Sequence, residues 1–170
     1  NKPAGYECSQ KPKHHASVVS LLPAPLRRRG LQPVGRLDRD TTGLLLLTDD
    51  GDWNHRLTSP TRQCEKVYRV QLRDPLSPQA IAQLEAGVLL RGEQRPTRPA
   101  RVALTDQSDW RQLLLTIHEG KYHQVKRMFA ATGNLVLGLH RERIGGIALD
   151  PGLAPGEYRP LTATEVRSIA

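Results

Sequence analysis

Residues 34–48 read VGRLDRDTTGLLLLT, in which two apolar runs enclose a polar turn. We expect strands over residues 34–38 and 43–48, because short runs of Val and Leu bounded by glycine are typical of buried strands. The turn between them begins at Asp38. A carboxylate at a strand end with cations close by can stay ionised while partly desolvated, which is the state that a nucleophile needs. A turn aspartate that hydrogen-bonds its own backbone is the alternative interpretation.

Short strand patterns also dominate the rest of the chain. They are expected over residues 66–73, 98–104, 112–118, 136–139 and 145–149. Helices are expected over residues 17–22, 52–57 (capped by Asp52), 77–87 and 121–132, and at a C-terminal capping box formed by Thr162 and Glu165. Because helices and strands do not alternate regularly, the pattern predicts an α+β fold, in one catalytic-size domain over residues 1–170.

The charge of the chain favours a polyanionic partner. Lys and Arg number 25 against 17 Asp and Glu, which gives a formal net charge of +8. The positive charge is concentrated in residues 1–39, 61–73 and 121–143, and most of it is Arg, which makes planar, bidentate contacts to phosphate. Residues 11–33 form a long basic loop that we expect to contact such a partner, for example a nucleic acid. An Arg-rich composition that merely reflects base usage in the gene is the alternative.

Several classes of protein are disfavoured by composition. Cys8 and Cys64 show no zinc spacing, so we expect packed, reduced thiols in a cytoplasmic protein. The longest apolar run, residues 44–47, is too short to span a membrane, and no signal peptide is visible. Aromatic residues make up 4% of the chain, which argues against a surface built on many stacked rings.

The acidic residues of the region 38–52 raise the possibility of a metal-dependent nuclease. The run Asp49, Asp50, Gly51, Asp52 is, however, typical of a turn followed by a helix cap. We therefore expect no metal site. No Ser-His-Asp order and no glycine-rich phosphate loop is present, so a hydrolase or a nucleotide-dependent enzyme has little support.

The predicted helix over residues 121–132 has two distinct faces. Val125, Met128 and Phe129 project to one side and Arg127 projects to the opposite side, towards solvent or phosphate. Lys126 lies at the edge of the apolar stripe, where its ammonium could reach a carboxylate, although ordinary snorkelling is the more frequent fate of such a lysine. In the predicted strand over residues 66–73, Tyr68 is either a packed strand residue or a ring that stacks on a base.

Five ordered motifs resemble those of the RsuA/RluB-type pseudouridine synthases. The central one is the stretch GRLDRDTTGLL at residues 35–45. The others are KPAG at 2–5, EKVY at 65–68, EGKYHQVKRM at 119–128 and LHRERIG at 139–145. The resemblance covers essentially the whole chain. It implies the pseudouridine synthase fold, a mixed, mainly antiparallel twisted sheet with flanking helices.

The resemblance also implies an isomerase that converts a uridine of folded RNA to pseudouridine without cofactor or metal. Asp38 corresponds to the residue that starts the reaction, Tyr68 to the ring that stacks on the flipped base, and Lys126 to the basic residue that pairs with the aspartate. Arg36 corresponds to the arginine that fills the gap or holds the backbone. Further RNA contacts are expected at Arg39, Lys121, Gln124, Arg127 and Arg141.

The chain departs from its relatives in two ways. The small S4-like RNA-binding domain that normally precedes the Lys-Pro motif is not in this sequence, so we expect the catalytic domain of a longer protein or a homologue without that domain. Many relatives carry Arg at the position of Lys126, and a lysine offers a compact charge rather than a fork.

Two stretches are similar to the small-subunit member of the family, YHQVKRMF at residues 122–129 and LAPGEYRPL at residues 153–161. They imply a uridine of bacterial 16S rRNA, in naked rRNA or an assembling small subunit, as the substrate of a monomeric protein with no membrane partner. A uridine of 23S rRNA is the close alternative. A non-catalytic RNA-binding module of ribosome assembly is the alternative from another class.

Overall fold

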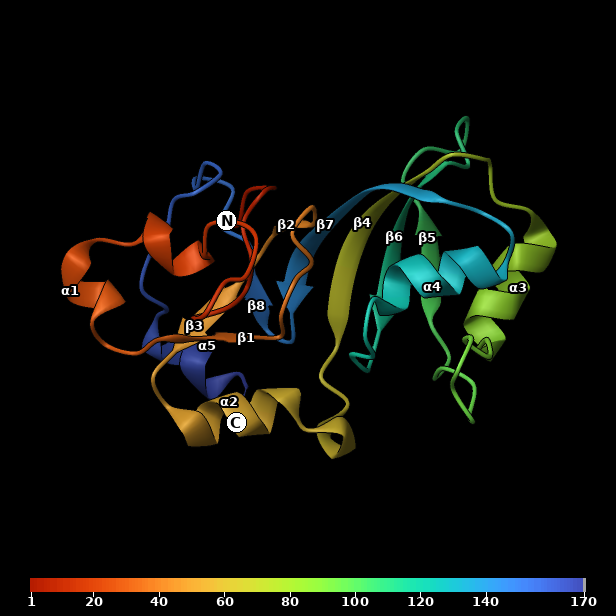
Figure 1. Ribbon diagram of the computed structural model, residues 1–170. Helices are drawn as coiled ribbons and strands as arrows, with labels where there is room; N and C mark the ends of the chain where they lie inside the picture. The colour runs from red at the N-terminus through yellow and green to blue at the C-terminus, as the bar shows by residue number, and fades with distance from the viewer. Residues whose placement is uncertain (170) are drawn as a thin grey trace. The chain divides into compact units, whose positions relative to one another are not determined.

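The computed structural model describes residues 1–169, and its contacts divide the chain into two compact units (Figure 1). Unit 1 consists of Asn1–Cys64 and the C-terminal segment that begins at Arg141, and unit 2 consists of Glu65–His140. The chain leaves unit 1 after Cys64 and returns to it at Arg141, and the single domain expected over residues 1–170 stays a prediction.

Unit 1 is built on short antiparallel strand pairs. Strand β1 (Gln32–Val34) pairs with β3 (Leu46–Thr48), and Val34 faces Leu46. Strands β2 (Thr42–Gly43) and β8 (Ile147–Ala148) both pair with β7 (Val136–Ile144), whose C-terminal end belongs to this unit. The core consists of apolar side chains from these strands together with Trp53 and Leu57 of helix α2 (Gly51–Thr58).

Several boundaries in unit 1 differ from the expected ones. The strand expected over residues 34–38 ends at Val34, and the next residue, Gly35, has a left-handed φ of 67° that turns the chain away from the extended conformation. The strand expected over residues 43–48 is divided into β2 and β3. Asp50, not Asp52, caps α2, and its Oδ1 accepts a hydrogen bond from Trp53 N at 2.9 Å.

Short helical segments flank this core. The helix expected over residues 17–22 is the 3₁₀ helix η1 (Val18–Leu21), capped by Ser17, and α1 (Ala24–Arg27) and η2 (Pro60–Arg62) were not predicted. The predicted capping box is present at α5 (Ala163–Arg167).

Unit 2 contains an antiparallel sheet with the strand order β7-β4-β6-β5. Strand β4 (Lys66–Leu72) pairs with β6 (Gln112–Ile117), which also pairs with β5 (Arg101–Leu104). Alternate residues of β4 are buried, as expected for a strand with one covered face. Helix α3 (Pro78–Ala86) begins at Pro78 and ends before Gly87, as predicted, and packs beside β5.

Helix α4 (Gln124–Ala131) begins later than expected, because residues 121–124 form a turn in which His123 has a φ of 48°. Its buried face consists of Gln124, Val125, Met128 and Phe129. The strand expected over residues 136–139 extends to Ile144 as β7, and the one expected over 145–149 is shortened to β8.

The predicted α+β class with a mainly antiparallel, twisted sheet is thus confirmed. The longest helix of residues 1–169, α3, has nine residues, so no helix in this part of the chain could cross a membrane.

Candidate active site

Asp38 lies in a tight turn of unit 1 between β1 and β2. Thr41 N donates to Asp38 O at 3.1 Å, which closes the turn, and the residue is half-buried. The turn leads directly into β2, where Gly43 forms a bridge with Lys2. The backbone therefore fixes the position of Asp38 from both ends of a short segment.

The side chain of Lys2 binds the backbone of this turn. Its side chain is 3% exposed, and its Nζ donates to the carbonyl oxygens of Pro3, Arg39 and Thr41 at 3.0, 3.0 and 2.8 Å. Burial lowers the pKa of this ammonium, and the nearby charges of Cys8, Asp40 and Asp38 act in the opposite direction. All three hydrogens of the ammonium are directed at backbone, so Lys2 acts as a clamp on the turn.

Arg141 fixes the two flanks of the same turn. It is 1% exposed, its Nε donates to Leu44 O at 2.9 Å, and its Nη2 donates to Gly35 O at 2.6 Å. The guanidinium thus joins the residue after β1 to the residue after β2. We expected Arg141 to contact RNA; the structure buries it among backbone carbonyls, and a direct RNA contact stays a prediction.

Gly43 allows the turn and β7 to approach closely. It has a φ of 104°, and a Cβ at this position would lie 2.3 Å from Arg141 O. The neighbouring amide, Leu44 N, donates to the same carbonyl at 2.7 Å. Only glycine fits here, which explains the glycine at the end of the DRDTTG run.

Arg39 is exposed, and its guanidinium is the first member of a hydrogen-bonded series that continues through His15 to Glu7. Its Nη1 lies 2.8 Å from His15 Nε2, and His15 Nδ1 lies 3.3 Å from Glu7 Oε1. This geometry fits the tautomer in which His15 accepts from Arg39 and donates to Glu7. Glu7 also accepts from the backbone N–H groups of Lys13, His14 and His15, so the start of the basic loop is ordered.

Arg36 and Cys8 differ in exposure at the segment that enters the turn. Arg36 is exposed, whereas Cys8 is 3% exposed and its Sγ accepts from Leu37 N at 3.4 Å. Burial raises the pKa of the Cys8 thiol. Within residues 1–169, neither Cys8 nor Cys64 is part of a disulfide.

Tyr68 and Lys126 belong to unit 2. Tyr68 lies on β4 opposite Leu115 of β6 and is 8% exposed, so its ring is held by the sheet. Lys126 is half-buried in the first turn of α4, beside the buried face formed by Val125 and Phe129. The expected pairing of Lys126 with Asp38 stays a prediction.

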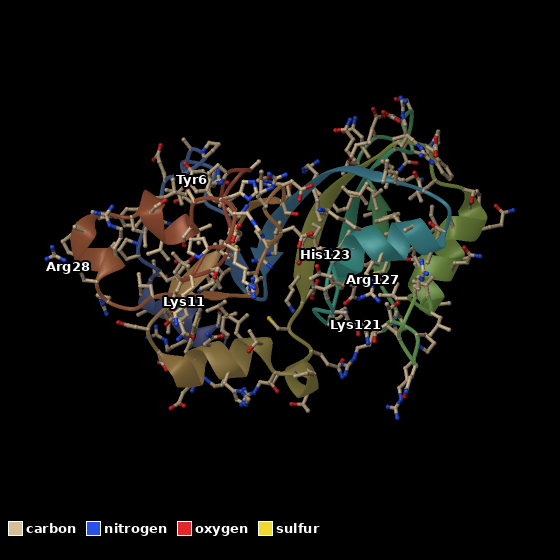
Figure 2. The ribbon with its side chains drawn as sticks, viewed as in Figure 1. Tyr6, Lys11, Arg28, Lys121, His123 and Arg127 are labelled. Atoms are coloured by element: carbon tan, nitrogen blue, oxygen red, sulfur yellow. The ribbon has the colours of Figure 1, made fainter. Side chains whose placement is uncertain are left out.

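Lys121, Gln124 and Arg127 are brought together at the start of α4, and Lys121 and Arg127 are labelled there in Figure 2. Lys121 Nζ and Arg127 Nη1 each lie 3.5 Å from a carboxylate oxygen of Glu93. Gln124, expected to contact RNA, is 4% exposed: its Oε1 accepts from Lys121 N at 2.8 Å and its Nε2 donates to Glu119 at 2.9 Å. Sequence reasoning missed Glu93, for which no motif gives a signal.

The acidic residues after β3 serve local structure. Asp49 forms an ion pair with Arg29 at 2.6 Å, and Asp50 caps α2. Within residues 1–169, no group of three or more His, Cys, Asp or Glu side chains is placed to hold a metal ion. The turn-and-cap interpretation therefore describes this segment.

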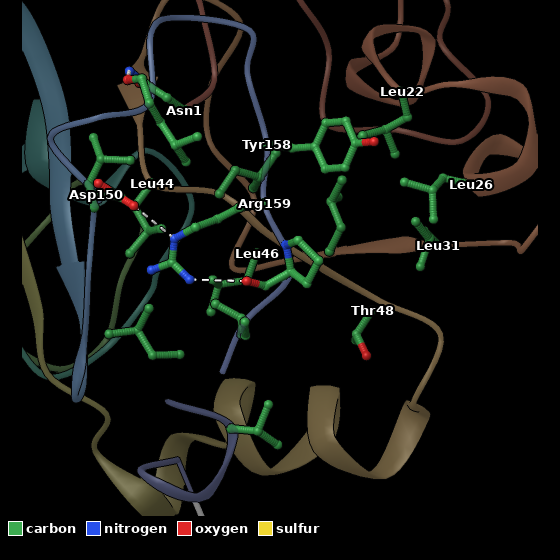
Figure 3. A pocket seen from close by; sticks show the side chains of 18 of the residues that line it. Asn1, Leu22, Leu26, Leu31, Leu44, Leu46, Thr48, Asp150, Tyr158 and Arg159 are labelled. Atoms are coloured by element: carbon green, nitrogen blue, oxygen red, sulfur yellow. Dashed lines mark hydrogen bonds and ion pairs between the residues drawn. The ribbon is translucent and has the colours of Figure 1, made fainter. Parts of the chain in front are cut away.

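Unit 1 also contains a pocket of about 490 Å³ with a mainly apolar lining, shown in Figure 3. Leucines of β3 and of the segment around α1 line it, together with Trp53 of α2. Arg159 projects among them, paired with Asp150 at 3.1 Å and with Glu165 at 2.8 Å. Since both acidic partners neutralise this guanidinium, the pocket offers no unpaired cation at Arg159 for an anionic ligand.

Comparisons with known proteins agree with the motifs. The profile of the RNA pseudouridylate synthase family matches residues 1–131. The chain is 54% identical over 169 residues to Ribosomal small subunit pseudouridine synthase A of Vibrio cholerae, covering 99% of this chain and 71% of that protein. The protein of the same name from Escherichia coli K12 is 53% identical, with the same coverage.

Solved structures give the same result. One described as a pseudouridylate synthase superposes with a TM-score of 0.93 and 50% identity, covering 100% of this chain and 71% of that one. The archaeal box H/ACA Nop10–Cbf5 complex matches with a TM-score of 0.60 and 18% identity over 91% of this chain and 49% of that one, which shows a shared fold. By its profile match, its identity to these relatives and its structure, this chain belongs to the RNA pseudouridylate synthase family.

Proposed function

We propose that this chain isomerises a uridine of 16S rRNA to pseudouridine. The observation that carries the proposal is the clamped Asp38 turn, in a chain that is 54% identical over 99% of its length to a synthase named for the small ribosomal subunit. The net charge of +8 suits an RNA substrate. Cytoplasmic rRNA, free or in an assembling small subunit, is the partner we propose for a monomeric protein.

The reaction that we propose needs no added atoms. The bond between N1 of uracil and C1′ of ribose breaks, the detached uracil turns, and a bond forms between C5 and C1′. C5 loses its proton and N1 gains one, so the product is an isomer of the substrate. Because atoms are neither added nor removed, this reaction does not require a glycine-rich loop that binds the phosphates of a nucleotide.

Asp38 is the proposed catalytic carboxylate, as nucleophile or as the base that starts the reaction. Lys2 and Arg141 bind backbone carbonyls of its turn, so the backbone that carries the carboxylate is fixed before RNA binds. Preorganisation of this kind lowers a barrier because no reorganisation is needed during the reaction.

For unit 2 we propose that Tyr68 stacks on the flipped uracil and that Lys126 is the cation that supports the Asp38 carboxylate. Arg36, which is exposed, is proposed to hold the RNA at the vacated position. Arg39, Lys121 and Arg127 are proposed to contact the RNA directly. For the buried Gln124 and Arg141 we propose an indirect effect, through the turns that they hold.

The test is modification of 16S and 23S rRNA transcripts by the purified chain, read out by carbodiimide labelling and primer extension. We expect one modified uridine in 16S rRNA and loss of the product in Asp38→Asn, with RNA affinity unchanged. Asp52→Asn, an exposed aspartate of α2, is the matched control and should keep wild-type turnover. Turnover by Asp38→Asn near the wild-type rate would remove Asp38 from its role, and product in 23S rRNA alone would select the alternative substrate.

Lys126→Met tests the second catalytic assignment. The substitution keeps most of the apolar stem of the side chain and removes its charge, so we expect a lower kcat with little change in the melting temperature. Lys126→Arg should restore much of the activity, because many relatives carry arginine at this position. An unchanged kcat in Lys126→Met would contradict the proposed role.

A further inference from the structure

Tyr122 and His123 form an exposed stack of two rings in unit 2, next to the start of α4. Their ring centroids lie 3.7 Å apart and the ring planes are inclined by 20°. Tyr122 is 76% exposed, the highest value among the exposed large hydrophobic side chains of residues 1–169. A tyrosine ring presents a large, rigid contact area with little rotamer entropy to lose on binding.

The backbone that carries this aromatic pair is fixed by hydrogen bonds. Gln124 N donates to Lys121 O at 3.1 Å, and Gln124 Oε1 accepts from Lys121 N at 2.8 Å. Arg127 Nη1 donates to Tyr122 O at 2.8 Å. The exposed rings therefore project from an ordered turn.

The local sequence at His123 is poor for stability. His123 has a φ of 48° and a ψ of 37°, a left-handed conformation that favours glycine, and Gln63 is the other non-glycine residue with positive φ among residues 1–169. His123 also occupies the N-cap position of α4 without making a side-chain cap, where Ser, Thr, Asp or Asn would stabilise the helix. Two unfavourable choices at an exposed site favour a functional explanation.

The surroundings of the aromatic pair are basic. Lys121 and Arg127 flank it and share the single carboxylate of Glu93, and Arg127 Nη2 donates to the carbonyl of Arg91, whose own side chain is exposed. Lys121, Arg127 and Arg91 carry three positive charges against the two carboxylates of Glu93 and Glu119, so this part of unit 2 keeps a positive balance that suits phosphate. A ring with an open face beside such a surface is the arrangement with which proteins bind single-stranded nucleic acid.

We infer that the aromatic pair is a stacking platform for an unpaired base of the RNA, with the neighbouring phosphate bound by Lys121 and Arg91. This inference rests on the proposed function for the identity of the RNA, and it assigns a binding role to two residues outside the proposed catalytic set. The base continues the stack on the open face of Tyr122. Stacking depends on a π-face that every base has, so the platform contributes affinity rather than sequence choice.

The test is fluorescence anisotropy of the purified chain with two RNAs: the 16S transcript and a fluorescein-labelled octamer of adenosine, which has no uridine to modify. Tyr122→Ala should weaken binding of both RNAs by about tenfold. Tyr122→Phe keeps the ring and should bind like wild type. Tyr158→Ala, which removes another exposed tyrosine in unit 1, is the matched control and should change neither affinity.

Two further readouts separate stacking from other effects. The salt dependence of binding should keep its slope in Tyr122→Ala and become shallower in Arg91→Ala, because only the arginine releases counterions. His123→Gly relieves the positive φ, so it should raise the melting temperature while it weakens binding. With the 16S substrate, Tyr122→Ala should raise KM and leave kcat close to wild type.

Octamer binding by Tyr122→Ala within twofold of wild type would overturn the inference, as would an equal loss in Tyr122→Phe. If Tyr122→Ala bound both RNAs normally and failed only on assembled subunits, the pair would contact a protein instead. A chain that forms no pseudouridine but still needs Tyr122 to bind the octamer would overturn the proposed function and leave the platform intact.

Discussion

The two units hold their proposed functional turns by different means. The Asp38 turn of unit 1 is held by two buried cations, Lys2 and Arg141, which donate to backbone carbonyls. The turn over residues 121–124 of unit 2 is held by the neutral amide of buried Gln124 and by the partly exposed guanidinium of Arg127, which donates to Tyr122 O, and it exposes the ring of Tyr122. One turn is built around buried charge and the other displays its side chains to solvent.

The difference has a physical consequence. A buried cation loses its hydration, and well-aligned hydrogen bonds must replace it, so the Asp38 turn has one favourable conformation. A neutral amide can exchange its partners for water at lower cost, so loss of the Gln124 bonds should disturb its turn less than loss of the Arg141 bonds disturbs the Asp38 turn. We therefore expect changes in the first turn to alter folding and turnover together, and changes in the second to act mainly on RNA binding.

The largest effect is expected for Gly43→Ala. The new Cβ would lie 2.3 Å from Arg141 O and 2.7 Å from Arg141 N, both backbone atoms, at a φ of 104°. We expect a loss of about 4 kcal/mol in the free energy of unfolding, measured by urea denaturation. Gly5→Ala is the control: φ is 95°, but nothing lies within 4 Å of the new Cβ, so the cost should be about 1 kcal/mol. Equal losses would show that steric contact with β7 is unimportant.

Arg141→Met should be the next most damaging change. It leaves the carbonyls of Gly35 and Leu44 without their buried donor, which should cost about 3 kcal/mol in the free energy of unfolding. Amide exchange should become faster in residues 35–44. Arg143→Met, two residues further along β7 and exposed, should cost less than about 0.5 kcal/mol. A similar cost for both variants would mean that Arg141 is not a clamp.

The corresponding change in unit 2, Gln124→Met, should cost about 1 to 2 kcal/mol. The side chain loses its bonds to Lys121 N and Glu119, but both partners are half-buried and can bind water. Gln79→Met, on the exposed side of α3, should be neutral within about 0.5 kcal/mol. If Gln124→Met were as damaging as Arg141→Met, the proposed contrast between the two turns would be wrong.

Local rules were sufficient for some elements. Helix α3 has proline at its first position and glycine after its last, and α5 has a capping box, so each end is determined by neighbours in sequence. Alternation of buried residues likewise located β4. The start of α4 could not be predicted in this way, because the helical period continues through His123, whose positive φ has no signal in the sequence.

The contacts that hold the Asp38 turn could not be predicted from neighbouring residues in the sequence. Arg141 contacts Leu44 and Gly35 across 97 and 106 residues, and in the sequence a buried arginine looks like one that binds RNA. Lys2 was noticed as part of a motif, but its three carbonyl partners depend on the folded turn. Asp38, Tyr68 and Lys126 were selected by the resemblance of motifs, since composition and periodicity left other interpretations open for each.

The smallest effect on stability is expected when the pH is lowered, and it should be larger for carboxylates of unit 1 than for those of unit 2. In unit 1 the pKa of Glu7 is lowered from 4.5 to about 2, first by the hydrogen bond from Lys13 N and then by those from His14 and His15. The pKa of Glu165 is also lowered to about 2, chiefly by its hydrogen bonds from Arg159. In unit 2, Asp106 and Asp109 have lowered pKa values through bonds to residues two positions away, which fix little of the fold.

A carboxylate with a lowered pKa stabilises the folded state fully above its unfolded pKa, and this contribution is lost as the pH falls through the folded pKa. For Glu7 the loss should therefore extend from about pH 4.5 down to about pH 2. Glu7→Gln should lower the melting temperature slightly at pH 6, and its difference from wild type should vanish near pH 2, while Asp106→Asn should show a smaller difference throughout. Amide exchange of residues 13–15, once corrected for its intrinsic pH dependence, should lose protection over the same range in the wild type. A pH-independent difference would mean that the protonated acid still holds the loop, and the charge of Glu7 would then have no part in ordering it.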